Sequence, residues 1–470
     1  MPIIIPGNSA VAGGFDVANS IRLDNNAYLN RTFNSGGGAS GGGGTFKWTL
    51  SFWVKRSKID TTQAIMSRYV NSAKYVKILF NSANELEYSV YNSADQIRLK
   101  TSAIFRDSTA WLHIVIAQDT TLSTAADRVK FFINGSRVTS FDTNTQPNQN
   151  TGGDFNTGSA PHQIGAFNGG ENLQGNFSQF CFVDNVQYAA DKFGEFDADS
   201  SIWKPIDVSD LSTGATSFLL AFENSSALGT DSSGDNNNFS VNNITATDQS
   251  TDTCTNNFAT LNPLNQSNSG YVFSEGNLKG TVSGAWLGGT STFFVNRGKW
   301  YWEYKYGSGN FGMGIAQQET DATYIGQIST SNQGYISYNV GGFEFFQNGS
   351  DTFNRTNNGN IGSYGSQATS GQIVMIAYDA DNGKLFAGRQ GTFFNSSNPA
   401  TGASPMFTVT SSAYFTPSLS IESGVHEINF GSPPYSESGG KTDASGFGNF
   451  AHEPPSGFFS LCTKNLAEYG

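Results

Sequence analysis

Apolar and polar residues alternate along much of this chain with a period of two, the pattern of β-strands that have one face in a core. In residues 49–55, TLSFWVK, Leu50, Phe52 and Val54 point one way and the residues between them point the other. Residues 111–117 are apolar on both faces, as expected for an inner strand of a sandwich. Asn134-Gly135 follows the alternating stretch 129–133 and predicts a tight hairpin, because both turn positions need a positive φ.

The second half of the chain shows the same rhythm. Residues 299–306, KWYWEYKY, place four aromatic side chains on one face of a predicted strand. Gln390-Gly391 is a second predicted hairpin tip. Further strands are predicted at 311–316, 373–379, 384–387, 415–421 and 425–430.

These patterns predict an all-β chain with two tandem sandwiches and almost no helix. We expect a short N-terminal arm at residues 1–20 and a first sandwich at 21–225. A polar linker is expected at 226–255, because Asp, Ser, Asn and Thr dominate it. The second sandwich is expected at 256–432. Residues 433–470 contain paired prolines, which cannot donate to a sheet, and are predicted to form a mostly irregular tail.

Composition narrows the class of protein. Only 14% of residues are charged, whereas Gly (54), Phe (38) and Tyr (18) are abundant, as in short aromatic strands joined by tight turns. The net charge of −12 argues against nucleic-acid binding, since such a surface repels phosphates. No stretch is long and apolar enough for membrane insertion. Residues 1–6 lack the features of a secretion signal, so synthesis in a cytoplasm is expected. Three cysteines cannot all pair, and a disulfide framework is not expected.

Ordered motifs in the first half are similar to those of a known superfamily. They are Trp53 in a Ser-Phe-Trp-Val strand, Trp111-Leu-His113, the Asn134-Gly135 hairpin and Ile164-Gly165. Taken in this order, residues 21–222 resemble the laminin-G-like branch of the concanavalin-A-like lectins. The resemblance implies a jelly-roll sandwich.

The second half resembles a SPRY domain, which is a related sandwich. The motifs that support this are Gly298–Glu303, Phe311–Ala316, Tyr378-Asp379 and Asn429-Phe430-Gly431.

Two flanking strings, at residues 252–263 and 457–466, are similar to segments of virion, tail-fibre or tailspike-like proteins of marine and cyanobacterial tailed phages. This resemblance implies a place in a phage particle, with other virion proteins as partners. It also implies a homo-oligomer, a trimer being the arrangement that fits a fibre.

Few residues suggest a binding site. Trp286, flanked by Gly284 and Gly288, and Tyr324, in a polar stretch, are predicted to be loop aromatics available to a ligand. The laminin-G-like resemblance would allow Asp119 to be a calcium ligand. No second acid is clearly placed to join it, so no metal or other cofactor is favoured.

Catalytic motifs are weak. Glycosidases of this fold carry carboxylates at every second position of one strand, and the nearest string is Glu195-Phe-Asp-Ala-Asp199. It lies among turn residues and predicts a solvated loop. The four histidines are scattered, and His113 shares a face with Trp111 and Val115, which predicts a packed core imidazole.

The sequence therefore favours a non-catalytic structural protein of a phage virion, tail-fibre-like or surface-appended. It would bind a host-surface glycan or other virion proteins. One alternative is a purely structural capsid or tail decoration. A second alternative is a polysaccharide depolymerase, which no motif supports.

Overall fold

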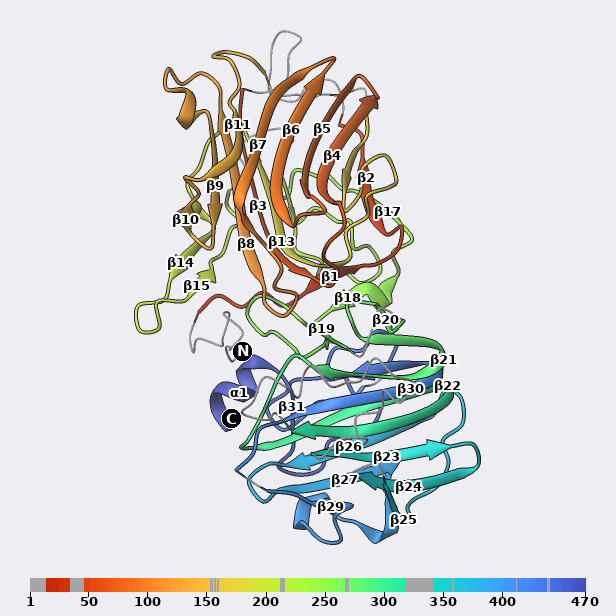
Figure 1. Ribbon diagram of the computed structural model, residues 1–470. Helices are drawn as coiled ribbons and strands as arrows, with labels where there is room; N and C mark the ends of the chain where they lie inside the picture. Colours follow the sequence, from red (N-terminus) through yellow and green to blue (C-terminus); the bar gives the residue numbers. More distant parts are fainter. Residues whose placement is uncertain are drawn as a thin grey trace. The chain divides into compact units, whose positions relative to one another are not determined.

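In the computed structural model, the chain is built almost entirely of β-strands, as predicted (Figure 1). The structure describes residues 14–33, 46–152, 155, 158, 160–211, 216–266, 270–317, 341–356, 359–410, 412–437 and 440–470. It divides into two compact units, the first ending at Thr255 and the second running from Asn256 to Gly470. Among the described residues, no helix combines the length and hydrophobicity that crossing a bilayer requires.

The first unit is a sandwich of two antiparallel sheets, which we call sheet A and sheet B. Sheet A has the strand order β10 (Ser136–Arg137), β9 (Val129–Ile133), β8 (Leu112–Asp119), β3 (Lys47–Arg56), β13 (Gly175–Asp184), β1 (Ser20–Leu23) and β18 (Gln249–Ser250), with β16 (Phe218–Leu220) beside β13. Sheet B has the order β11 (Phe141–Thr145), β7 (Asp95–Ile104), β6 (Glu85–Asn92), β5 (Lys74–Phe80), β4 (Gln63–Asn71), β12 (His162–Ile164), β2 (Tyr28–Arg31) and β17 (Ser240–Asn242). A separate hairpin pairs β14 (Gly194–Phe196) with β15 (Trp203–Pro205).

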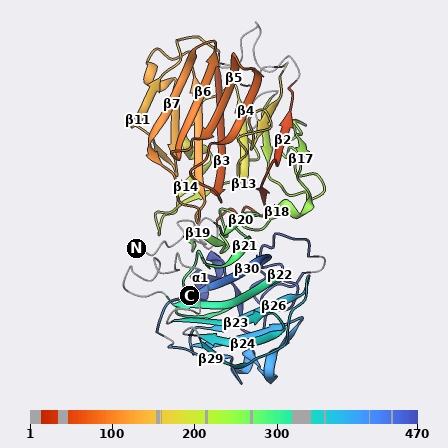
Figure 2. The same cartoon turned by 45° about the vertical axis from the view of Figure 1, so that its right-hand side comes forward.

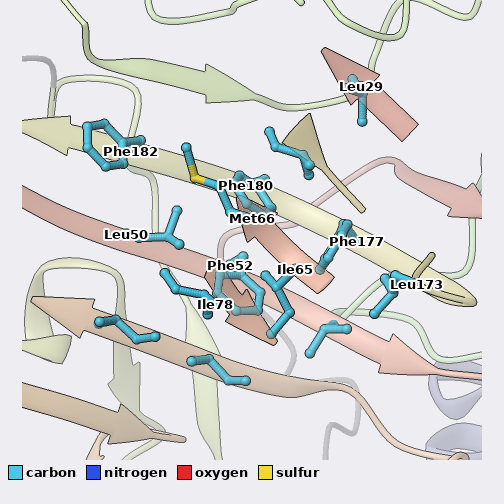
Figure 3. Close-up of a cluster of buried hydrophobic side chains, with 14 of the residues drawn as sticks. Leu29, Leu50, Phe52, Ile65, Met66, Ile78, Leu173, Phe177, Phe180 and Phe182 are labelled. Atoms are coloured by element: carbon cyan, nitrogen blue, oxygen red, sulfur yellow. The ribbon is translucent and has the colours of Figure 1, made fainter. Parts of the chain in front are cut away.

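The core of the first unit lies between the inner faces of sheets A and B. Leu50 and Phe52 of β3 contribute to it together with Phe177 of β13, and all three are fully buried. Met66 and Ile78 come from sheet B, and Figure 3 shows these side chains in one cluster. The alternation predicted for residues 49–55 is confirmed, since the core takes Leu50, Phe52 and Val54.

Residues 226–255, for which the sequence predicted a linker, contribute β17 and β18 to the sheets of the first unit. Their polar side chains form hydrogen bonds with backbone groups of the turns between these strands. The buried carboxylate of Asp231 accepts hydrogen bonds from the backbone N–H groups of Leu219, Ser233 and Asn237. The polar composition therefore serves turn hydrogen bonding.

The second unit is one continuous sheet that folds back on itself. Its main order is β19 (Leu261–Gln266), β21 (Lys279–Ser291), β30 (Phe415–Asn429), β22 (Lys299–Gln317), β23 (Gly342–Asn348), β24 (Asp351–Thr356) and β25 (Gly359–Ser363). Branches are formed by β20 (Val272–Ser274), β26 (Ile373–Asp379), β27 (Lys384–Arg389), β28 (Thr392–Phe393), β29 (Phe407–Thr408) and β31 (Phe459–Ser460). The helix α1 (Thr463–Tyr469) ends the chain.

Strands β21, β22 and β30 are long because each bends at a glycine-containing corner. The sequence predicted separate strands at 299–306 and 311–316, and this was wrong, since both belong to β22. The strands predicted at 415–421 and 425–430 likewise merge in β30, which ends at Asn429. Register shifts mark the corner between Tyr306 and Asn310.

Two glycines allow these corners to pack. A Cβ on Gly307 would lie 2.1 Å from the carbonyl oxygen of Val425, and a Cβ on Gly424 would lie 1.8 Å from that of Ser308. The backbones of β22 and β30 therefore approach too closely for a side chain at either position. This close backbone approach joins the two layers of the second unit.

The two predicted Asn-Gly and Gln-Gly hairpins are confirmed. Asn134 and Gly135 have φ values of 45° and 79°, and they join β9 to β10. Gln390 and Gly391 have φ values of 51° and 81°, and they join β27 to β28.

The segment that opens the second unit pairs with the end of the chain. The Ala259 N–H donates to the Leu461 carbonyl at 3.0 Å, and the Thr463 N–H donates to the Asn257 carbonyl at 2.9 Å. Asp443 fastens the end further, because its carboxylate accepts from the Ser460 N–H and from the Asn465 side chain. Residues 257–259 of the first string thus pair with residues 461–463 of the second.

We predict that Gly424→Ala destabilises the second unit by about 1–3 kcal/mol, the usual cost of forcing extra atoms into packed surroundings. Denaturant unfolding of the full chain, with hydrogen exchange of β26 peptides to localise the effect, measures this. Gly362→Ala is the matched control, because the atom nearest its Cβ would be Asn354 Oδ1 at 4.0 Å. Equal stability of the two variants would contradict the steric account of the corner.

Candidate functional site

The outer face of sheet A is covered by the chain itself. Trp53, Trp111 and Val115 are buried on this face beneath residues 186–211, which add Phe193 and Trp203. This second cluster is separate from the core between the sheets. The face is therefore closed to a large ligand.

His113 ties the covering segment to sheet A. Its ring lies between the indoles of Trp53 and Trp203, with ring centroids 4.6 and 5.8 Å away. The Trp203 Nε1–H donates to His113 Nδ1 at 2.9 Å, so the proton of the neutral ring is on Nε2, 2.9 Å from Ser51 Oγ. Burial lowers the pKa of His113 to about 3. The predicted packed core imidazole is confirmed.

A buried ion pair fastens the end of the first unit to the same face. Lys55 Nζ lies 2.7 Å from Asp252 Oδ2, and both side chains are buried. The Trp111 Nε1–H donates to the other oxygen of Asp252 at 3.1 Å. Removing one partner of such a pair costs about 3–5 kcal/mol, because it leaves an uncompensated buried charge.

The outer face of sheet B carries a row of tyrosines. Tyr69, Tyr75 and Tyr91 are cross-strand neighbours on β4, β5 and β6, which lie side by side in Figure 2. Each is half-buried and alternates with residues that point into the core. The rings of Tyr75 and Tyr91 stack, with centroids 5.1 Å apart and an interplanar angle of 16°. Together they form a small aromatic platform.

The loop 165–173 borders this platform. It turns at Asn168-Gly169, where both residues have positive φ, and Phe167 and Gly170 exchange two backbone hydrogen bonds across the turn. Phe167 packs against Tyr69 and Tyr75, with ring centroids 5.4 and 5.3 Å away. The four rings therefore form one cluster on the open face.

Lys77 holds the loop in place. Its Nζ lies 4.4 Å from the Phe167 ring centroid and 3.1 Å from Glu171 Oε1. The Ser67 hydroxyl donates to the Ala166 carbonyl, and the Glu171 carbonyl accepts from the Ala64 N–H. The loop is thus fixed to sheet B before any ligand arrives.

Beside the platform, charged side chains form pairs across strands. Arg98 Nε lies 3.1 Å from Glu87 Oε1, and the Arg98 guanidinium also contacts Asp95 at 3.5 Å. Lys100 pairs with Glu85 at 3.2 Å. These groups present many hydrogen-bonding atoms next to the aromatic rings.

The hydroxyl of Tyr75 stays protonated. Partial burial raises its pKa, and the nearby Asp95 and the ring of Tyr91 add to this shift. Because Tyr75 and Tyr91 stack face to face, the platform presents ring edges together with the protonated hydroxyl of Tyr75, which suits a ligand that has both C–H groups and hydroxyl groups.

Trp286 does not lie on a loop, so that part of the prediction was wrong. It is a half-buried residue of β21 that is paired with Glu422 of β30. Its ring stacks on Phe346, with centroids 4.8 Å apart, and Arg355 lies over the same Phe346 ring at 4.5 Å. The flanking glycines misled the prediction, because Gly284 is at the strand corner and Gly288 pairs with Ser420 inside the sheet. A ligand-binding role for Trp286 stays a prediction.

Tyr324 lies outside the described residues. Asp119 ends β8, where it accepts from the N–H and hydroxyl of Thr121 and lies 3.3 Å from Lys47 Nζ. Its carboxylate is thus used to close the turn after β8. Among the residues that the structure describes, no group of three or more His, Cys, Asp or Glu side chains is placed to hold a metal ion.

The acidic string at 195–199 stabilises a turn. Asp197 accepts hydrogen bonds from the backbone N–H and the hydroxyl of Ser200. These bonds lower the pKa of Asp197, and their effect exceeds the opposite effect of burial. Glu195 is exposed and pairs with Lys204 at 3.2 Å. These carboxylates do not straddle a cleft as a glycosidase pair would.

Glu303 is a buried carboxylate with a pKa in the range of a catalytic acid. Burial raises its pKa to about 7, although hydrogen bonds to it oppose the shift. Its oxygens accept from the N–H groups of Ala451 and His452 and from the side chains of Tyr301 and Asn429. The side chain is fully buried. It therefore anchors the C-terminal segment to β22, much as His113 anchors residues 186–211.

The tyrosine platform was not predicted, yet its signal is present in the sequence. Tyr69, Tyr75 and Tyr91 occupy the polar positions of alternating strands, beside Ser67, Lys77 and Ser89. Aromatic residues on the polar side of a strand have no core to fill, and this marks them as surface contacts.

Comparison with known families supports a lectin-like fold for the first unit. Residues 33–186, which are 154 of the 470, match the family described as the Concanavalin A-like lectin/glucanases superfamily. No curated protein shows significant sequence similarity to the chain.

Several solved structures are similar in fold. A candidate carbohydrate-binding protein from Bacteroides ovatus shows 15% identity with a TM-score of 0.35, covering 49% of this chain and 60% of its own. The SPRY domain of human HERC1 shows 12% identity with a TM-score of 0.26, covering 36% and 96%. A heptameric SAP-like pentraxin from Limulus polyphemus shows 14% identity with a TM-score of 0.26, covering 37% and 80%. Likenesses at these identities and scores carry no information on ligands.

The predicted all-β architecture of two sandwiches is confirmed, and the family match at residues 33–186 agrees with the laminin-G-like prediction for the first unit. The SPRY resemblance of the second unit stays a prediction. None of these matches indicates a phage origin, which stays a prediction.

We predict that Glu303 makes the second unit less stable as the pH rises. The folded-state pKa of about 7 lies above the ordinary value of 4.5, so the contribution is full below pH 4.5 and is lost as the pH rises through 7. The loss amounts to about 3 kcal/mol by this shift. Glu303→Gln should remove this part of the pH dependence, as measured by denaturant unfolding of the full chain between pH 4.5 and 8.

Glu468→Gln serves as the control, because it removes the same charge from an exposed position on α1. If wild type and Glu303→Gln lose stability in parallel across this range, Glu303 does not carry the effect.

Proposed function

We propose that the chain is a non-catalytic binding protein whose first unit binds glycan on the open face of sheet B. The observation that carries the proposal is the cluster of Tyr69, Tyr75, Tyr91 and Phe167 on a solvent-facing sheet, next to paired charges. Pyranose rings have apolar C–H faces and a rim of hydroxyls. Such rings fit a surface of clustered aromatic side chains bordered by carboxylates, ammonium and guanidinium groups.

The lectin-like family match supports this proposal, because it covers the strands that build the platform. The site is small, so a single copy is expected to bind weakly. A homo-oligomer that presents several copies would bind with much higher avidity.

We further propose that the protein works on the particle of a tailed phage, in a tail-fibre-like or surface-appended position. The resemblance of the strings at 252–263 and 457–466 to phage proteins supports this setting. Their pairing in the second unit gives a structural reason why they occur together. Gold-labelled antibody against the chain, applied to purified particles, tests it. A distal label supports adhesion, whereas a label spread over the capsid would favour a decoration role.

We predict that Tyr91→Ala weakens glycan binding at least tenfold, because it removes half of the Tyr75–Tyr91 stack. Tyr91→Phe should keep most of the affinity, since the ring face remains. Binding to a microbial glycan array, followed by calorimetry with the best ligand, measures both effects.

Tyr414→Ala is the matched control, because Tyr414 is a 40% exposed tyrosine of the second unit. Equal glycan binding by wild type and Tyr91→Ala would place the glycan site elsewhere. Release of new reducing ends from a bound polysaccharide would instead indicate a depolymerase.

A further inference from the structure

We propose that the platform on sheet B selects neutral glycans and rejects acidic ones. This inference rests on the proposed function and names the chemical class of its ligand. It comes from the way in which the charges on this face are paired.

Three cations beside the platform have carboxylate partners. Lys77 pairs with Glu171 through both carboxylate oxygens, at 3.1 and 3.3 Å. Lys100 pairs with Glu85, and the Arg98 guanidinium lies between Glu87 and Asp95. These three cations face four carboxylates, so the ion pairs among the described residues here leave no excess positive charge for a uronate, sialate or sulfate.

Because these ion pairs are partly buried, it is costly to replace a carboxylate partner by an acidic sugar. The side chain of Lys77 is only 17% exposed, and its Nζ also lies over the rings of Phe167 and Tyr75. An acidic sugar that took Lys77 from Glu171 would leave a partly buried carboxylate without its cation. It would also release the loop 165–173, which Lys77 helps to hold.

The rest of the face opposes an anion as well. Glu85 and Glu87 are buried, at 8% exposure each. They belong to β6 and occupy the same set of alternate positions as Tyr91. The whole chain carries a net charge of −12, which repels anionic polymers over a Debye length.

A neutral sugar meets none of these penalties. Its hydroxyls donate to Asp95 or Glu171 and accept from Arg98 without breaking an ion pair, since a hydroxyl is both donor and acceptor. Its C–H groups contact the outer edges of the stacked rings of Tyr75 and Tyr91. Because neighbouring strands are about 4.8 Å apart, the row from Tyr69 to Tyr91 spans roughly 10 Å. This length suits a short stretch of a glycan chain that runs across the strands.

The test compares polysaccharides that differ only in charge. Neutral glucan, mannan and galactan are each paired with their carboxymethylated or sulfated derivatives, and binding of the full chain is measured at 50 and 500 mM NaCl. We expect at least tenfold tighter binding to one or more neutral members than to their charged counterparts. That binding should depend on Tyr91 and change little with salt.

A charge variant sharpens the test. Glu171→Gln together with Glu87→Gln frees Lys77 and Arg98 from one carboxylate each, and we expect the preference for the neutral member to fall at least threefold. The matched control is Glu422→Gln with Glu427→Gln, which removes two charges from β30 in the second unit.

The outcomes separate the two proposals. Tyr91-dependent binding that is tightest for a charged derivative would overturn the neutral selectivity and leave the glycan site in place. An absence of Tyr91-dependent binding to every polymer would overturn the glycan site itself. An unchanged preference in the Glu171→Gln, Glu87→Gln variant would show that the paired charges do not set the selectivity.

Discussion

The architecture depends on buried polar groups that hold chain segments against the outer faces of the sheets. A polar group without a partner is expensive to bury, so each of these groups fixes both its own position and that of its partners. His113 does this between Ser51 and Trp203, and Asp252 does it between Lys55 and Trp111. Glu303 plays the same part in the second unit. Without these bonds the large aromatics on these faces would be exposed to water.

This anchoring decides which aromatic side chains the chain itself covers. In the first unit, residues 186–211 cover Trp53 and Trp111 of sheet A. These two side chains and Trp203 are buried in one cluster. On sheet B, the loop 165–173 borders the outer face, where Ser67, Glu87 and Ser89 are buried and the three tyrosines are half-buried. Three of the half-buried aromatics on this face are tyrosines, which tolerate water at the hydroxyl end while keeping an apolar ring. The division between the two outer faces therefore follows from which residues each face carries.

Local patterns were enough to predict most strands and several orientations. The alternation of residues 49–55, the hairpin at Asn134-Gly135 and the packed His113 all depend on neighbours in sequence or on one strand, and the structure confirms them. The continuity of β22 could not be predicted in this way. In the sequence, Gly307 and Gly309 indicate the end of a strand. Only the close approach of β30 shows that they form a corner inside one strand. Trp286 was misplaced for the same reason.

The platform escaped prediction because its parts are distant in sequence. Tyr69, Tyr75 and Tyr91 come from three strands, and Phe167 arrives from a loop that follows β12. Periodicity identifies each tyrosine as outward-facing, but it does not say which of two outer faces the chain will cover.

That choice depends on residues 186–211, whose indole at Trp203 fits against both Gly135 and Gly194. A Cβ at either glycine would come within 2.6 Å of this indole. The Asn134-Gly135 turn is therefore also the place where residues 186–211 pack against the hairpin. The hairpin glycine therefore has a second role, which acts on the opposite side of the sandwich from the tyrosines. Its missing side chain gives the Trp203 indole the space that keeps residues 186–211 on sheet A.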